Sequence, residues 1–231
     1  MSTPIKVDIW SDIACPWCYI GKRKFETGSG IFAERGDGRE VEVEYHSYEL
    51  SPDTPVDFDG NETDFLAAHK GIDPSQVGQM LERVTGIASA VGLDYDYDIL
   101  KHTNTVKAHQ LVHYAKAHGQ QLQAKERLLK AYFIEGRHVG RVEDLADLAA
   151  EIGLDRADVV RSLEEDEYLP GVRADQEMAQ ELGIQGVPFF VIDHKYGVSG
   201  AQESDTFDQV LEQVWTERDT DAADESEEAT A

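Results

Sequence analysis

Hydrophobic and polar residues alternate in two short segments near the start of the chain. Residues 5–10 and residues 41–46 each place apolar side chains at every second position, a period that is typical of β-strands with one buried face. Between them, residues 14–34 predict a helix that ends before the Gly-Asp-Gly sequence at 36–38. Residues 1–60 therefore predict a β-α-β unit followed by a loop at 51–60.

The pattern changes to a helical period over residues 62–182. Glycines at positions 71, 92, 119, 136 and 153 interrupt the apolar stripes, so this segment predicts several helices. Closer to the C-terminus, the pattern predicts a helix at 170–182, a strand that starts after Pro188, a hairpin strand at 195–199 and a helix at 203–217. Residues 218–231 carry Asp, Glu, Ala and Thr without an apolar period, and we expect this acidic tail to be disordered.

This order of elements predicts an α/β fold in which a helical segment separates two parts of one domain. Residues 1–60 supply the β-α-β half and residues 183–217 supply the β-β-α half. Residues 61–182 form a helical insertion, whose last helix could belong to the first domain. A length of 231 residues, of which 41% are hydrophobic, is enough for one large domain or a domain with an insertion.

The formal net charge of −25 is extreme, with 46 Asp and Glu residues against 21 Lys and Arg residues. This excess of negative charge argues against binding to nucleic acid through phosphates. Salt screens the self-repulsion of such a surface, so we expect a halophilic protein of a salt-rich, haloarchaeal-type cytoplasm. No segment reaches transmembrane length, and residues 1–6 lack the layout of a signal peptide, so we expect a cytoplasmic protein without a membrane partner. The sequence does not indicate an oligomeric state.

Both cysteines stand in Cys15-Pro16-Trp17-Cys18, directly after the first predicted strand. A cysteine in the first turn of a helix faces free N–H groups and the positive end of the helix dipole, which favour the thiolate. We therefore expect a thiol–disulfide redox site in which the more exposed Cys15 is the nucleophile and Cys18 resolves the mixed disulfide. Pro16 suits the first helical turn, whereas a partly exposed Trp17 would either contact the substrate or pack against the insertion.

Two other interpretations of the cysteine motif carry less support. A zinc site needs four ligands, but the chain has no second cysteine pair, and His109 and His113 lie in a remote helical segment. A structural disulfide would close a very short loop and so stabilise the fold only weakly. Asp12 is either a charge that opposes the Cys15 thiolate or a turn residue, and His109 is either catalytic or a hydrogen-bonded structural residue. We expect neither a metal nor a cofactor.

Several segments of the chain resemble the DsbA-like thioredoxin superfamily, and within it the FrnE-like branch. This branch lies near 2-hydroxychromene-2-carboxylate isomerases and kappa-class glutathione transferases. The matching segments are residues 11–23 around the cysteine motif, 104–109 (Asn-Thr-Val-Lys-Ala-His), 131–136 (Ala-Tyr-Phe-Ile-Glu-Gly), and 186–192 (Gly-Val-Pro-Phe-Phe-Val-Ile) running on to 195–202. The resemblance spans residues 5–215 and implies a thioredoxin fold with a helical insertion.

The resemblance also implies roles for individual residues. A cis Val187–Pro188 bond would lie against the Cys15–Cys18 pair and leave the preceding backbone free to pair with a substrate, the alternative being a trans bond in an ordinary turn. Asn104 is a candidate to line the cleft that faces Cys15. Related transferases and isomerases usually carry serine at position 15, so the chain looks like an oxidoreductase that acts on a protein or small thiol or disulfide. The alternative is a glutathione-type transferase or isomerase in which Cys15 binds or activates a small thiol.

Overall fold

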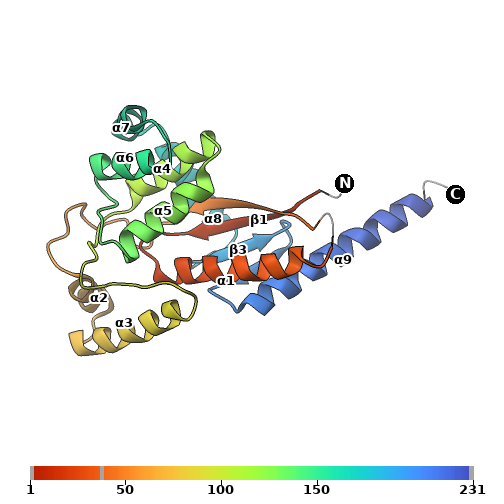
Figure 1. Ribbon diagram of the computed structural model, residues 1–231, viewed down its shortest axis with the longest axis horizontal. Helices are drawn as coiled ribbons and strands as arrows, with labels where there is room; N and C mark the ends of the chain where they lie inside the picture. Colours follow the sequence, from red (N-terminus) through yellow and green to blue (C-terminus); the bar gives the residue numbers. More distant parts are fainter. Residues whose placement is uncertain (1–2, 37–38, 229–231) are drawn as a thin grey trace.

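A mixed sheet of four strands forms the centre of the computed structural model, which describes residues 3–36 and 39–228 (Figure 1). The strands lie in the order β2 (Val41–Ser47), β1 (Ile5–Ser11), β3 (Phe189–Ile192) and β4 (Tyr196–Ser199). β1 and β2 are parallel, whereas β3 runs antiparallel to both β1 and β4. The four strands confirm the strand segments that the alternating pattern predicted, with only their end residues differing.

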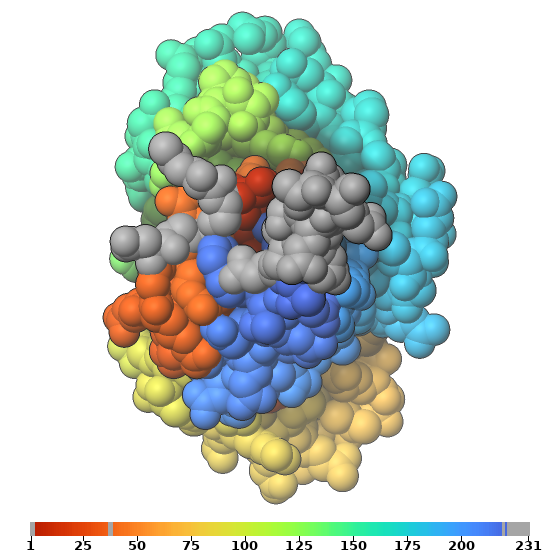
Figure 2. Space-filling model, turned by 90° about the vertical axis from the view of Figure 1, so that its right-hand side faces the viewer, coloured from red at the N-terminus to blue at the C-terminus, as the bar shows by residue number. Residues whose placement is uncertain are grey.

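Helices surround the sheet, and most of them belong to the segment between β2 and β3. In chain order, they are α1 (Pro16–Ala33), α2 (Glu62–Lys70), α3 (Pro74–Ser89), α4 (Val106–Ala117), α5 (Gln121–Phe133), α6 (Val142–Glu151), α7 (Arg156–Glu164), α8 (Leu169–Glu181) and α9 (Ser204–Glu228). α1 packs along α9, and α8 packs against β2. The helices α4 to α7 form one group, whereas α2 packs on α3, and α3 reaches α1 (Figure 1). Viewed end-on, α9 and α1 lie between these two groups (Figure 2).

Strand β1 is buried on both faces, and its alternating side chains reach two different layers. Ile9 lies in the main core together with Phe25 of α1 and Phe207 of α9. Trp10 points to the opposite face, where its indole N–H donates to the Asp175 carbonyl oxygen of α8 at 3.0 Å. Because helices hold β1 from both sides, the end of this strand is a rigid support for the cysteine motif that follows it.

Helices α1 and α9 approach so closely that only glycine fits at position 28. A Cβ atom there would lie 2.4 Å from the Ser204 carbonyl oxygen and 2.8 Å from the Phe207 Cβ. A Cβ atom at Gly30, on the same helix, would meet nothing within 4 Å. The close contact holds the helix that carries the cysteine motif against the C-terminal helix.

Strand β2 is an edge strand, and a side chain of the inserted helices covers its outer side. The Gln121 amide, at the start of α5, accepts a hydrogen bond from the Tyr45 N–H at 3.0 Å and donates to the Tyr45 carbonyl oxygen at 2.8 Å. One glutamine thus takes up both backbone polar groups of a strand residue, and it ties the insertion to the sheet.

The C-terminal segment departs from its prediction. α9 extends to Glu228, so the expectation of a disordered tail is wrong for residues 218–228, and residues 229–231 lie outside the described chain. Lengthening a helix that has already formed is easier than starting one, and the Ala and Glu residues of this segment favour a helix. The absence of an apolar period therefore did not exclude a helix here.

The connectivity places α2 to α8 between a β-α-β unit and a β-β-α unit. This arrangement confirms the predicted α/β class and the thioredoxin fold with inserted helices. The last inserted helix, α8, contacts both β2 and α4. Within the described residues, no helix combines the length and the apolar character that crossing a membrane requires.

Candidate active site

The cysteine motif follows the end of β1 and opens helix α1. Cys15 occupies the N-cap position in an extended conformation, with φ −93° and ψ 112°, and Pro16 follows as the first helical residue. The Cys15 side chain makes no capping hydrogen bond, and the Cys18 N–H donates to the Cys15 carbonyl oxygen at 3.0 Å. Both sulfurs therefore belong to the first turn of a helix, as the motif predicts.

Both cysteines are free thiols, and both are buried. Cys15 is 3% exposed and Cys18 is 2% exposed, so the predicted greater exposure of Cys15 is only a marginal difference. The two cysteines differ more clearly in their surroundings. Within the described residues, Cys15 lines a cavity, and Cys18 is not part of the lining of that cavity. Residues of α2 and α3 form other walls of that cavity, so the inserted helices are what separate Cys15 from bulk solvent.

The segment just before β3, with Val187 and Pro188, lies directly against the cysteine motif. The Val187–Pro188 peptide bond is cis, as the resemblance implied. The Cys15 thiol donates to the Val187 carbonyl oxygen at 3.5 Å. Pro188 packs on α1 beyond the cysteines, since a Cβ atom at Gly21 would lie 2.9 Å from its Cγ. The structure thus brings together the residues that the two sequence motifs supplied separately.

A cavity of about 330 Å³ opens beside Cys15. Its walls come from the start of α1, the loop after β2, the helices α2 and α3, and the segment before α4. Most of the lining is apolar, and it includes Leu50, Phe65, Leu66, Met80, Leu81 and Val84. Trp17 also lines the cavity and is 40% exposed, which confirms its predicted partial exposure. A cavity of this size suits a small molecule or one side chain of a larger substrate.

Polar side chains also line this cavity. The Glu62 carboxylate lies 2.8 Å from Nδ1 of His102, whose ring stacks on Phe65 with the ring centroids 3.6 Å apart. Nε2 of His102 and the hydroxyl of Tyr97 are buried, and neither has a hydrogen-bond partner within the part of the chain that the structure describes. Both residues line the cavity, which therefore offers hydrogen bonds as well as apolar contact to a ligand.

Asp12 is a buried carboxylate in the turn that precedes the motif. It accepts hydrogen bonds from the Ile13 N–H at 2.7 Å and from the Leu50 N–H and the Thr105 hydroxyl, both at 2.8 Å, and it lies 3.1 Å from His109 Nε2. Burial raises the pKa of Asp12, but the hydrogen bond and charge of His109, with the other donors, hold it below its ordinary value. The sequence left two roles open for Asp12, and the structure supports both. Asp12 is a turn residue, and its negative charge opposes a thiolate at Cys15. His109 is its hydrogen-bonded partner.

The two thiols share a hydrogen bond, and their surroundings move their pKa values in opposite directions. The hydrogen bond that Cys15 shares with Cys18, together with burial and the negative charge of Asp12, raises the pKa of Cys15 well above its ordinary value. Burial also acts against a Cys18 thiolate, but the hydrogen bond from Cys15, the positive charge of Lys125 and the nearby Ser11 hydroxyl lower the pKa of Cys18 overall. Contacts with neighbouring side chains thus act against a thiolate at Cys15, which the helix N-terminus favours.

Lys125 is a buried cation that sequence reasoning missed. It is 1% exposed, and its ammonium group donates to the Ser11 carbonyl oxygen at 3.1 Å. Burial lowers the pKa of Lys125 to about 8, although the nearby thiols oppose this effect. A signal was present, because Lys125 stands on the buried stripe of α5 between Ala124 and Leu128. An ionisable residue on such a stripe is unusual enough to mark a candidate site.

Within the described residues, the lining of the cavity does not include Asn104. The prediction that Asn104 lines the cleft facing Cys15 is therefore wrong. Its side-chain amide donates to the Pro52 carbonyl oxygen at 2.8 Å, and its Oδ1 accepts the Val106 N–H at 2.9 Å. These bonds tie the loop after β2 to the first turn of α4. Thr103 and Thr105, on either side of it, line the cavity instead. The resemblance thus identified the correct segment but the wrong side chain.

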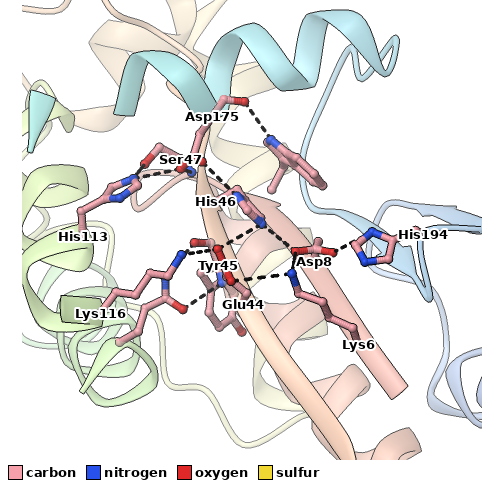
Figure 3. A network of polar contacts seen from close by, with 12 residues as sticks. Lys6, Asp8, Glu44, Tyr45, His46, Ser47, His113, Lys116, Asp175 and His194 are labelled. Atoms are coloured by element: carbon pink, nitrogen blue, oxygen red, sulfur yellow. Dashed lines mark hydrogen bonds and ion pairs between the residues drawn. The ribbon is translucent and has the colours of Figure 1, made fainter. Parts of the chain in front are cut away.

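A second polar cluster lies on the face of the sheet that α8 covers (Figure 3). His46 bridges two carboxylates, with Nε2 2.8 Å from Asp8 and Nδ1 2.9 Å from Asp175; burial lowers the pKa of His46, but these contacts raise it overall. Ligand atoms of Asp8, Glu44 and His46 lie within 4.8 Å of one another, close enough to hold a metal ion. The Lys6 ammonium already lies 3.6 Å from Asp8 and 3.9 Å from Glu44, so cations of the chain itself balance these carboxylates.

Comparison with known proteins agrees with this geometry. The model of the DSBA-like thioredoxin domain family matches residues 6–212. The crystal structure of a probable DsbA oxidoreductase from Streptomyces coelicolor is 40% identical in sequence, covers 92% of this chain and 91% of that chain, and has a TM-score of 0.84. The protein YwbO of Bacillus subtilis is 28% identical over 209 residues, which are 90% of this chain and 96% of that protein.

A more distant structure shares the fold alone. The cytosolic disulfide reductase DsbM of Pseudomonas aeruginosa, solved with GSH, is 18% identical, covers 91% of this chain and 99% of that chain, and has a TM-score of 0.62. The family match extends over both halves of the sheet and all the inserted helices. The chain therefore belongs to the DSBA-like thioredoxin domain family.

Proposed function

We propose that this protein is a thiol–disulfide oxidoreductase that exchanges disulfides through Cys15 and Cys18. The observation that carries the proposal is a pair of free thiols in one helical turn. Within the described residues, Cys15 lines the cavity and Cys18 is not part of its lining. A disulfide that enters the cavity meets Cys15 first. Cys18, behind it, is placed to attack the Cys15 sulfur instead of the substrate.

The reaction in the reductive direction has two exchange steps. The Cys15 sulfur loses its proton and attacks one sulfur of the substrate disulfide, whose S–S bond breaks and whose other sulfur leaves as a thiolate. The Cys18 sulfur then attacks Cys15, the mixed disulfide breaks, and the second substrate thiol leaves. A reducing thiol restores the Cys15–Cys18 pair. Run in reverse, the same steps donate a disulfide to a substrate dithiol.

The cavity supports a small thiol or disulfide, or one cystine side chain of a protein, as the substrate. Its apolar wall would hold the body of the substrate, while His102 and Tyr97 offer hydrogen bonds to a polar group. The DsbM structure was solved with GSH, and by analogy a small thiol is a candidate substrate here. We further propose a cytoplasmic role, as for the cytosolic DsbM, in concentrated salt that screens the net charge of −25.

Replacing each cysteine by serine tests the proposal, and the two variants are matched controls because each removes one buried sulfur. In concentrated KCl, the wild type should reduce glutathione disulfide with dithiothreitol as the reductant. Cys15→Ser should abolish this turnover, and Cys18→Ser should accumulate a mixed disulfide at Cys15 that intact-mass measurement detects. A wild type that forms no reversible Cys15–Cys18 disulfide would overturn the proposal. Full thiol-transfer or isomerase activity in Cys18→Ser would favour the glutathione-type transferase or isomerase instead.

A further inference from the structure

His102 is a buried histidine in the wall of the cavity, and among the described residues only one of its two ring nitrogens has a partner. Nδ1 lies 2.8 Å from the Glu62 carboxylate of α2 and 3.2 Å from the Tyr132 hydroxyl. An ionised carboxylate can only accept, so Nδ1 carries a hydrogen and donates to Glu62. Nε2 is left without a partner. A buried polar atom in this state is costly, so Nε2 is a candidate contact for a ligand.

His46, in the polar cluster under α8, shows which groups this chain places on the two sides of an imidazole. Its Nδ1 lies 2.9 Å from Asp175 and its Nε2 lies 2.8 Å from Asp8 (Figure 3). Both partners are carboxylates, so both ring nitrogens carry hydrogens. His102 repeats one half of this arrangement, with Glu62 at its Nδ1. A carboxylate at Nε2 would complete it, and the described part of the chain supplies none there.

Tyr97 brings a second unpaired group to the same cavity. Its hydroxyl is buried and has no hydrogen-bond partner among the described residues. Burial raises the pKa of Tyr97, so the hydroxyl keeps its proton and can donate. Lys70, the last residue of α2, adds a positive charge to the lining. These groups suit an anionic ligand, although the chain as a whole has a net charge of −25.

The two carboxylates in the lining oppose an anionic ligand less than free carboxylates would, because each has a histidine partner. Asp12 lies 3.1 Å from His109 Nε2, and Glu62 lies 2.8 Å from His102 Nδ1. Most of the remaining wall is apolar, and Cys15 lines it although its exposed fraction is only 3%. The cavity thus joins a thiol to hydrogen-bond donors through an apolar space.

Resting on the proposed function, we propose that the substrate is a small disulfide or thiol that carries a carboxylate, and that His102 Nε2 and the Tyr97 hydroxyl bind this carboxylate. The apolar wall contacts the carbon chain between the carboxylate and the sulfur that reacts with Cys15. A cavity of about 330 Å³ suits a molecule of this kind. A folded protein fits less well, since α2 and α3 separate Cys15 from bulk solvent. The contact selects among small disulfides before any bond is exchanged.

Two disulfides that differ in charge but hardly in shape test this assignment. 3,3′-Dithiodipropionate carries a carboxylate at each end, and its diamide carries a neutral amide at each end instead. In concentrated KCl with dithiothreitol as the reductant, the wild type should reduce the acid with a kcat/KM about tenfold or more above that of the diamide, because hydrogen bonds to a charged group are the stronger ones. Loss of substrate, followed by chromatography, gives both values.

Substitution of His102 should remove this preference. His102→Gln keeps only a neutral donor and should lower kcat/KM for the acid about tenfold. The loss should appear in KM, because a contact remote from the reacting sulfurs binds the ground state and the transition state alike. The value for the diamide should stay nearly unchanged. His118→Gln is the matched control: the His118 ring also stacks on an aromatic ring, that of Tyr114, but within the described residues His118 is not part of the cavity lining. It should leave both values unchanged.

Equal kcat/KM values for the two disulfides in an active wild type would overturn the proposal, and so would an equal loss for both in His102→Gln. If His102→Gln does not fold by circular dichroism, Tyr97→Phe removes the second donor and should lower the value for the acid several-fold; no loss there would count against the proposal as well. Reduction of the disulfides of insulin as fast as that of the acid would overturn the restriction to small substrates.

The proposed function fails separately, because binding can be measured without exchange. Calorimetry on Cys15→Ser should show tighter binding of the acid than of the diamide, and adding His102→Gln should remove the difference. This result would support the carboxylate site even in a protein whose wild type reduces neither disulfide. Equal binding of the two disulfides to Cys15→Ser would overturn the carboxylate site and leave the exchange reaction untouched.

Discussion

Replacing Asp12 by asparagine should lower stability and raise thiol reactivity at the same time. The substitution keeps the shape of the side chain but removes the charge that pairs with His109. It also turns one acceptor oxygen into an N–H₂ group, which would face the Leu50 N–H or the donors Thr105 and His109. Breaking a buried charged pair from one side costs about 3–5 kcal/mol. For a chain of this size, we expect the Tm to fall by roughly 6–20 °C.

The same substitution should make Cys15 more reactive. The Asp12 charge is one of the causes that raise the pKa of Cys15, so its removal lowers that pKa. A decrease of about one unit means about tenfold more thiolate at neutral pH. The assay is the pH dependence of iodoacetamide alkylation in a Cys18→Ser background, with thermal and urea denaturation of the same proteins. Because the pKa of Asp12 is lowered by folding, its stabilisation is present above its ordinary value of about 3.9 and is lost as the pH falls through the folded value.

Asp8→Asn is the matched control. Asp8 lies on β1, whereas Asp12 follows the end of that strand. Asp8 is also buried and pairs with His46 at 2.8 Å, but it points to the face under α8. We expect a comparable loss of stability with no change in the alkylation profile of Cys15. An unchanged profile in Asp12→Asn, or an equal change in Asp8→Asn, would refute the local electrostatic reasoning.

Four further substitutions test three separate parts of the structure. Trp17→Ala should change the free energy of unfolding by no more than about 1 kcal/mol, because the side chain is 40% exposed. The same substitution should raise the KM for a disulfide substrate several-fold. An unchanged KM would show that the indole makes no substrate contact. Gly28→Ala should destabilise the protein by about 1–3 kcal/mol in thermal denaturation. Gly30→Ala, which has open space around its new Cβ atom, should be neutral or stabilising in the same experiment. Equal effects of the two substitutions would contradict the close α1–α9 contact. Folding raises the pKa of His46, so its stabilisation is full below about pH 6.5 and is lost as the pH rises through the folded value. The gap in unfolding free energy between wild type and His46→Gln should therefore narrow with rising pH, and a widening gap would contradict the bridge to Asp8 and Asp175.

Features with a local signal could be predicted from the sequence. The alternation at residues 5–10 and 41–46 identified β1 and β2, because both strands have side chains that alternate between two environments. The cysteines after the first strand identified the start of α1. The resemblance to a known family added the cis bond at Pro188, which no local pattern could have distinguished from a trans bond.

Features that depend on the docking of distant segments could not be predicted. Lys125 reaches the Ser11 carbonyl oxygen across 114 positions, and Asp12 reaches Thr105 and His109 across 93 and 97 positions. Periodicity shows that a residue lies on the buried face of a helix, but it does not show what lies opposite. For the same reason, the helix pattern could not show that Lys125 of the insertion would bring a positive charge to the thiol of Cys18.

The glutamine that covers β2 has a consequence for association between chains. An exposed sheet edge is a template on which another extended chain can add, and such additions lead to aggregation. Gln121 occupies both backbone groups of Tyr45 near the middle of β2, so an incoming strand would have to displace α5 before it could pair there. The opposite edge is β4, which has four residues and offers little length for pairing. The inserted helix thus protects β2 against strand addition at Tyr45.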